Sequence, residues 1–161
     1  MIRLRLPAVT SAVVSLLLLG ACIDASGPEV TEPQVIEETN FAASLEIDLG
    51  TMTETASGLY VGTILEGTGD PSAAGDTVSV LYEGFLSDGA VFDSSDLSGP
   101  FSFTLGAGVS VAGFDEGVTG MKVGGVRRII IPPSLGYGNQ QVGAIPPGSI
   151  LVFRLDLVSI N

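Results

Sequence analysis

The sequence predicts an α+β domain in which a curved antiparallel sheet of five or six strands wraps around one short helix. Several segments alternate apolar and polar residues with the period of two that is typical of strands, as residues 76–86 do. One segment, residues 113–121, instead places Phe114, Val118 and Met121 on a single helical face. Glycine accounts for 22 of the 161 residues, and this abundance favours a turn-rich β fold over a helical bundle.

The charged and nucleophilic residues exclude several classes of function. The chain has 18 acidic and 6 basic side chains, no His and one Cys. Nucleic-acid binding needs clustered Lys and Arg, so we expect no nucleic-acid partner. Without His, the chain can form neither an ordinary His/Cys zinc site nor a Ser-His-Asp or Cys-His nucleophile system, and we expect no metal and no cofactor.

Residues 1–21 have the features of a bacterial lipoprotein signal peptide. Two Arg residues precede an apolar run at residues 8–19, and small residues follow it. The sequence Leu19-Gly20-Ala21-Cys22 resembles the lipoprotein box, in which the signal is cut before a Cys that is then lipidated. We therefore expect acyl chains on Cys22 to anchor the protein to a membrane of the cell envelope, outside the cytoplasm. A plain signal peptide with an incidental Cys and an uncleaved membrane anchor are the alternatives.

Residues 22–54 are predicted to be an acidic, flexible tether that begins at the lipidated Cys22. They contain two prolines and no Lys or Arg, and both self-repulsion and proline favour an extended chain. Apolar residues within 41–49 could form a short strand or dock on the domain. Once residues 1–21 are removed, 4 basic and 18 acidic side chains remain, a formal charge of −14. Anionic lipid headgroups should repel such a chain, so the lipid itself would hold it.

Residues 55–161 are predicted to form the globular domain. Its expected strands lie at residues 57–65, 76–86, 90–92, 101–105, 123–131 and 150–158. The helix at 113–121 has Asp115 and Glu116 in its first turn, where the helix dipole favours acidic residues. Arg127 and Arg128 are expected to be an exposed pair at a sheet edge.

The hairpin at the centre of the domain predicts a cleft. Ser87-Asp88-Gly89 can form a tight turn, because Asp and Gly adopt turn conformations easily. The returning run then places Phe92 and Asp93 opposite Tyr82. A hydroxyl, an aromatic ring and a carboxylate at one sheet edge could line a binding site. An ordinary hairpin with only apolar contacts is the alternative.

Seven short motifs follow one another in the order and near the spacing of a known family. They are Tyr82-Glu83-Gly84, Gly89-Ala90-Val91-Phe92-Asp93-Ser94-Ser95, Pro100-Phe101-Ser102-Phe103, Gly113-Phe114-Asp115-Glu116-Gly117, Ile131-Pro132-Pro133 with Gly136-Tyr137-Gly138, Ile145-Pro146-Pro147, and Leu151-Val152-Phe153. In these motifs residues 57–161 resemble the FKBP-type peptidyl-prolyl cis-trans isomerases, which bind rapamycin-type macrolides. The resemblance implies a ligand cavity between the curved sheet and the helix.

The resemblance also implies which residues form that cavity. The expected catalytic residues are Tyr82, Phe92, Asp93 and Tyr137. The expected substrate-binding residues are Phe101, Val111, Phe114, Ile145 and Phe153. Three features depart from well-studied members: residues 94–100 contain no Arg, Phe114 stands where Trp is usual, and the loop at 139–145 is one residue shorter.

These residues suit proline isomerisation, which needs no nucleophile, metal or general base. The Xaa-Pro bond rotates over a barrier of about 18–20 kcal/mol, and a dry aromatic pocket would favour the twisted, less polar amide. The Tyr137 hydroxyl would orient a substrate carbonyl, and Asp93 is expected to bond the Tyr82 hydroxyl rather than carry a proton. Expected partners are proline-containing polypeptides and rapamycin-type macrolides, and we expect a monomer. The alternatives are a weakly catalytic peptide-binding or chaperone module on the same fold, and a purely structural lipoprotein.

Overall fold

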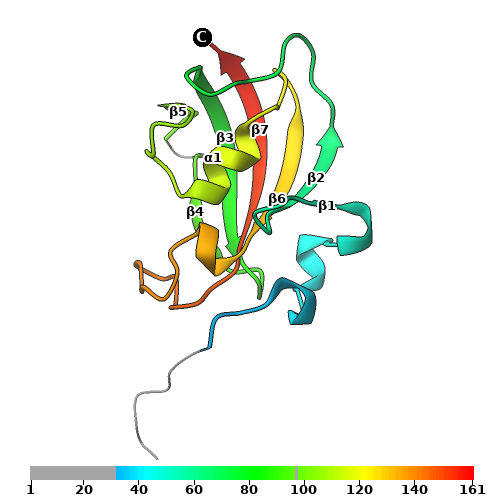
Figure 1. Ribbon diagram of the computed structural model, residues 1–161, viewed down its shortest axis with the longest axis vertical. Coiled ribbons are helices and arrows are strands. Elements are labelled where there is room, and N and C mark those ends of the chain that lie inside the picture. Colours follow the sequence, from blue (N-terminus) through cyan, green and yellow to red (C-terminus); the bar gives the residue numbers. More distant parts are fainter. Residues whose placement is uncertain (1–31, 97) are drawn as a thin grey trace, which may run out of the picture. The chain divides into compact units, whose positions relative to one another are not determined.

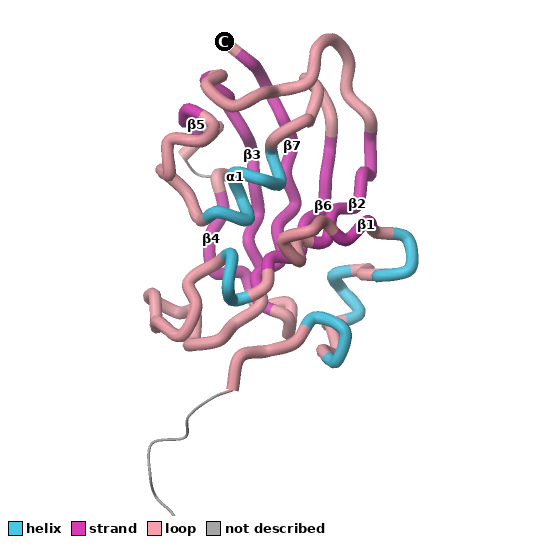
Figure 2. The backbone as a smooth tube through the Cα atoms, viewed as in Figure 1, coloured by secondary structure: helices cyan, strands magenta, loops and turns pink. Residues whose placement is uncertain are grey.

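The computed structural model describes residues 32–96 and 98–161 (Figures 1 and 2). The predicted signal peptide at 1–21, Cys22 and the first part of the predicted tether lie outside the described residues. Residues 31–161 form one compact unit, and the following description concerns that unit.

The described residues form seven strands in one antiparallel sheet. The strands are β1 (Thr53–Glu54), β2 (Tyr60–Leu65), β3 (Thr77–Leu86), β4 (Val91–Ser94), β5 (Phe101–Thr104), β6 (Val126–Ile131) and β7 (Leu151–Ile160). They follow the order β1-β2-β6-β7-β3-β4, and β5 also pairs with β3. The predicted fold class is therefore confirmed, and the two-residue β1 is the strand that no sequence pattern indicated.

The described residues contain a single α-helix, α1 (Ala112–Val118), which lies across one face of the sheet (Figure 1). It is shorter than predicted, because Thr119 has a non-helical ψ of 133° and Gly120 adopts a φ of 79°. Met121 therefore lies beyond the helix but is still buried, at 3% exposure. The other helical turns are 3-10: η1 (Ile36–Glu38), η2 (Ala43–Leu45), η3 (Leu49–Thr51) and η4 (Pro133–Leu135). None of the helices in the described part of the chain is long and apolar enough to cross a bilayer.

Alternation along the strands divides the buried residues between two cores. On the helix side, Leu151, Phe153 and Leu155 of β7 belong to the main core, whereas Val152 packs on the opposite side of the sheet. Gly113 lets α1 approach the sheet closely, since a Cβ there would lie 2.5 Å from Cγ2 of Ile131. A larger residue at this position would push the helix off its core.

Residues 32–52, which we call the strap, cover the opposite face of the sheet. The strap buries Ile36 and Leu45, each 4% exposed, against residues that include Ile130 and Val152. The prediction that residues 22–54 form a flexible tether is therefore wrong for residues 32–40, whereas the expected alternative, that apolar residues within 41–49 dock on the domain, is confirmed. Docking had been expected only between residues 41 and 49, but Ile36 lies before that range. A few isolated apolar residues are sufficient to dock this acidic segment, because each of them packs against an apolar face of the sheet.

Hydrogen bonds fix the strap to the rest of the domain at several points. The Gln34 amide N–H donates to the Gly148 carbonyl at 2.9 Å, and the Ile150 N–H donates to the Gln34 side-chain oxygen at 2.9 Å. Arg128 donates from Nη1 to the Glu46 carbonyl at 3.0 Å. Arg127 extends toward the helix and donates to the Gly117 carbonyl at 2.7 Å. The expectation of an exposed edge pair is wrong, because β6 lies between β2 and β7 and both arginines bind backbone carbonyls.

Candidate functional site

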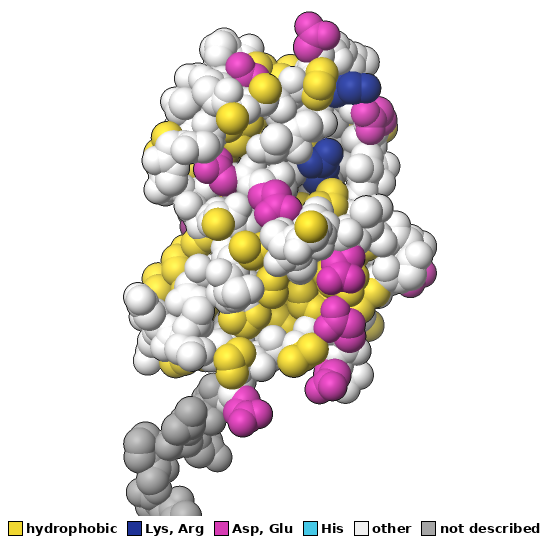
Figure 3. Space-filling view, viewed as in Figure 1, with side chains coloured by type: hydrophobic (Ala, Val, Ile, Leu, Met, Phe, Trp, Pro, Cys, Tyr) yellow, Lys and Arg dark blue, Asp and Glu magenta, His cyan; other side chains and the backbone are white. Residues whose placement is uncertain are grey.

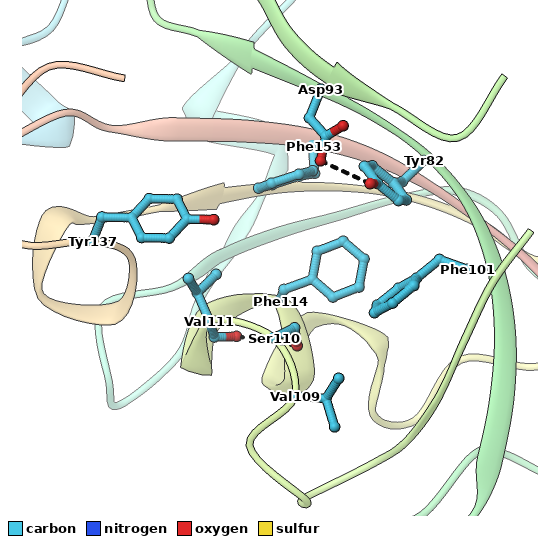
Figure 4. Close-up of a pocket in the computed structure, with 9 residues that line it drawn as sticks. All are labelled: Tyr82, Asp93, Phe101, Val109, Ser110, Val111, Phe114, Tyr137 and Phe153. Atoms are coloured by element: carbon cyan, nitrogen blue, oxygen red, sulfur yellow. Dashed lines mark hydrogen bonds between the residues drawn. The ribbon is translucent and has the colours of Figure 1, made fainter. Parts of the chain in front are cut away.

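An open pocket of about 270 Å3 lies between α1, the sheet and two loops (Figure 4). Its lining residues are Tyr82, Asp93, Phe101, Val109, Ser110, Val111, Phe114, Tyr137 and Phe153. Seven of these were predicted from the sequence as site residues. The strands β3, β5 and β7 supply its aromatic wall, and the start of α1 supplies its floor.

The β3–β4 hairpin brings Tyr82 and Asp93 together as predicted. Asp93 stands opposite Gly84 in the strand pairing, and the Tyr82 hydroxyl donates to Asp93 Oδ2 at 2.8 Å. Asp93 Oδ1 accepts a second hydrogen bond from the Ser94 amide at 2.9 Å. Asp93 thus has two hydrogen-bond donors, although residues 94–100 contain no Arg.

Two effects keep the Tyr82 hydroxyl protonated. Burial in the pocket, followed in size by the hydrogen bond to Asp93, raises the pKa of Tyr82 from 10.0 to about 12. A neutral phenol is therefore favoured in the folded protein, and this contribution to stability is fully present below pH 10 and is lost as the pH rises towards 12. At neutral pH the pocket presents a hydroxyl here and not a phenolate.

We expect the Asp93→Asn substitution to lower the pKa of Tyr82 while leaving it above 10.0, because burial, the larger cause, remains. The measurement is tyrosinate absorbance against pH in a Tyr60→Phe background, since hydrogen bonding to Glu37 also raises the pKa of Tyr60 to about 12. Asp70→Asn removes an exposed carboxylate elsewhere and should change nothing. An unchanged tyrosine titration in the Asp93→Asn variant would contradict the proposed Tyr82–Asp93 coupling.

Phe114 forms the centre of the aromatic cluster. It is 4% exposed, and its ring centroid lies 5.2 Å from that of Phe153 and 5.7 Å from that of Tyr82, both edge to face. Phe101 lies 6.4 Å away and stacks on Phe103 at 5.0 Å. Edge-to-face aromatic pairs favour a fixed ring arrangement, so the pocket wall is held in shape before a ligand arrives.

The pocket mouth is formed by two loops. Val111 is the N-cap residue of α1, and the two residues before it, Val109 and Ser110, also line the pocket. These two residues could not be predicted from the sequence, because no alternation or motif marks them. Tyr137 lies after η4 and is 37% exposed, and its hydroxyl points into the pocket (Figure 4).

Phe92 and Ile145 were predicted to contact the substrate, but neither lines the pocket. Phe92 packs edge to face on Phe153, with ring centroids 5.4 Å apart. Gly84 makes room for this contact, because a Cβ there would lie 2.7 Å from Phe92 Cζ. Ile145 is 5% exposed and belongs to the main core. We therefore infer that both residues support the pocket from outside its lining.

The pocket's chemistry is that of apolar binding with a few polar groups. Most of the lining side chains are aromatic or aliphatic, and no Lys or Arg is among them. In the described segments, no three His, Cys, Asp or Glu side chains gather as metal ligands would. Such a site can hold a compact apolar ring and hydrogen-bond a carbonyl group beside it.

Comparisons with known proteins agree with this geometry. A model of the family described as FKBP-type peptidyl-prolyl cis-trans isomerase matches residues 69–158. "FK506-binding protein 4" of Mycosarcoma maydis is 46% identical over 111 residues, which are 69% of this chain and 30% of that protein. "FK506-binding protein 2" of Yarrowia lipolytica is 54% identical over 89 residues, or 54% of this chain and 62% of the relative. The chain thus spans less than two thirds of either relative.

Two solved structures share the fold. The crystal structure of FkpA from Escherichia coli has a TM-score of 0.64 and 37% identity, covering 69% of this chain and 52% of that one. A peptidyl-prolyl cis-trans isomerase from Pseudomonas syringae pv. tomato has a TM-score of 0.63 and 30% identity, covering 74% and 86%. With the family match and the aromatic pocket, these likenesses establish that the chain belongs to the FKBP-type peptidyl-prolyl cis-trans isomerase family.

Proposed function

We propose that this protein catalyses cis-trans isomerisation of Xaa-Pro bonds in exported polypeptides. The observation that carries the proposal is the aromatic pocket itself, where Phe101, Phe114 and Phe153 surround a space of about 270 Å3 and Tyr137 supplies a hydroxyl at its mouth. The pocket suits a pyrrolidine ring, and its lining would exclude water from the Xaa-Pro amide on the N-terminal side of that ring. Similarity to isomerases by sequence and by fold supports the same assignment.

Catalysis would arise from better binding of the twisted amide than of either planar form. Twisting breaks the amide resonance and reduces charge separation, so an apolar environment favours the twisted state. The Tyr137 hydroxyl would donate to a substrate carbonyl and fix its orientation. Asp93 would hold Tyr82 through the 2.8 Å hydrogen bond and would not transfer a proton.

We expect Tyr137→Phe to lower kcat/KM by about threefold to tenfold, the value of one neutral hydrogen bond made in the transition state. The assay follows isomerisation of a short Xaa-Pro peptide by residues 23–161. Tyr60→Phe, which removes a hydroxyl on the other side of the sheet, is the matched control and should keep full activity. No isomerisation by the unaltered chain would refute the function, whereas full activity in Tyr137→Phe would refute only that residue's role.

A weakly catalytic peptide-binding or chaperone module is the second candidate. It is favoured by two sequence features, the lack of Arg in residues 94–100 and Phe114 at the usual Trp position. A folded protein that binds proline peptides but does not accelerate their isomerisation would support this alternative. By likeness to relatives named for FK506 binding, we also propose macrolide binding in the same pocket.

We further propose that Cys22 is lipidated and anchors a monomeric protein to a bacterial envelope membrane, facing away from the cytoplasm. The support is the sequence around Leu19-Gly20-Ala21-Cys22. Incorporation of labelled palmitate into the full chain, lost in Cys22→Ser, is the expected result. Membrane association without label would instead indicate an uncleaved anchor, and secretion without label would indicate a plain signal peptide.

A further inference from the structure

A second cavity lies beside η4 and is as large as the aromatic pocket. Its volume is about 330 Å3, against about 270 Å3 for the aromatic pocket. Its apolar walls include Pro33 and Val35 of the strap and Pro132 and Pro133 at η4. We call this cavity the η4 groove. Figure 3 shows an apolar area in this region, with acidic side chains along one side.

The η4 groove combines exposed apolar surface with negative charge. Val35 is 49% exposed although it is a large apolar residue. Glu37 and Glu54 also line the groove and accept hydrogen bonds from the Tyr60 hydroxyl at 2.7 and 3.3 Å. The bond from Tyr60 lowers the pKa of Glu37, so this carboxylate stays ionised at neutral pH. The lining contains no Lys or Arg.

Backbone hydrogen bonds connect the η4 groove to the loop that carries Tyr137. The Gly138 N–H donates to the Pro133 carbonyl at 2.9 Å, the Gly148 N–H to the Gly138 carbonyl at 2.8 Å, and the Gln34 N–H to the Gly148 carbonyl at 2.9 Å. The groove wall, the pocket loop and the strap therefore share one scaffold. A polypeptide whose proline lies in the aromatic pocket could therefore also contact the η4 groove with a neighbouring part of its own chain.

We propose that the η4 groove binds a cationic segment with apolar side chains, belonging to the same polypeptide whose proline occupies the aromatic pocket. Charge complementarity selects this occupant: carboxylates attract Lys and Arg, and the proline and valine walls take apolar side chains. An acidic segment, such as residues 22–31 of this chain with Asp24, Glu29 and no Lys or Arg, would be repelled. This inference rests on the proposed isomerase function, because it assigns a further contact to the same substrate.

The test compares three peptides in the isomerisation assay with residues 23–161. One is a short Xaa-Pro peptide, the second carries a Lys- and Leu-rich extension on a Gly-Ser linker, and the third carries the same extension with Glu in place of Lys. Linkers of several lengths are used, since effective concentration depends on span. We expect the Lys extension to lower KM by about fivefold at low salt, and this gain to disappear at high salt.

Three variants locate the effect. Glu37→Gln with Glu54→Gln keeps acceptors for Tyr60 but removes the charge, and Val35→Ser removes an apolar wall; each should abolish the gain from the Lys extension. Glu66→Gln with Asp70→Asn makes the same charge change outside both cavities and should preserve it. All variants should isomerise the short peptide normally, because none touches the aromatic pocket.

The outcomes separate this inference from the proposed function. Normal turnover of the short peptide, with no difference between Lys and Glu extensions, would overturn the groove and leave the isomerase intact. If the short peptide is not turned over, anisotropy of the labelled Lys-rich peptide still decides the matter. Binding lost in Glu37→Gln with Glu54→Gln would uphold the groove as a cationic-segment site, and binding unchanged in that variant would overturn it.

Discussion

The substitution Phe114→Ala should reduce both the activity and the stability of this protein more than any other single change in the pocket. Phe114 is 4% exposed and contacts Tyr82, Phe101 and Phe153. Truncating a buried Phe lowers the free energy of unfolding by about 3–5 kcal/mol. Apolar contact with a side chain of this size stabilises the bound transition state by about 1.5–3 kcal/mol. We therefore expect kcat/KM to fall about tenfold to hundredfold when Phe114 is truncated.

The matched control is Phe103→Ala. Phe103 is also 4% exposed and stacks on Phe101, but it does not line the pocket. Denaturant unfolding should show similar losses of stability for the two variants, while kcat/KM, measured where both are folded, should fall much further for Phe114→Ala. Equal losses of activity would mean that the pocket floor has no special role in turnover.

Removing the strap should produce the other large effect. Ile36 and Leu45 each bury a large apolar side chain on the sheet, and the two together contribute roughly 3–6 kcal/mol. We therefore expect residues 55–161 to be less stable than residues 32–161 by at least this amount. The free energy of unfolding in urea is the measurement.

A matched control accompanies the strap deletion. Ile36→Ala with Leu45→Ala should reproduce most of the loss in an otherwise complete chain. If residues 55–161 proved as stable as 32–161, the strap would not be part of the folded domain.

The strands and most of the pocket could be predicted from the sequence because each has a local signature. Alternation located β3 and β7, the Asp-Gly turn fixed the hairpin, and the hairpin register then set Tyr82 beside Asp93. These features depend on neighbours in the chain. The family motifs supplied the distant pocket residues such as Tyr137.

The strap was mispredicted because its packing depends on a surface that lies far away in the sequence. Ile36 and Leu45 stand alone among acidic residues, so the composition of the segment resembles that of a flexible tether. The three consecutive apolar residues Ile129–Ile131 are the sequence feature that could have indicated the packing of the strap. They are all fully buried, which an antiparallel strand can achieve only if both faces of the sheet are covered.

We infer that one aromatic pocket both binds the proline and lowers the rotation barrier. Isomerisation of a short Xaa-Pro peptide by residues 23–161, measured with and without rapamycin, tests both roles together. We predict acceleration by the unliganded protein and complete inhibition at one equivalent of bound drug. Acceleration that persists when the drug saturates the pocket would contradict the claim, because the reaction would then take place elsewhere on the protein.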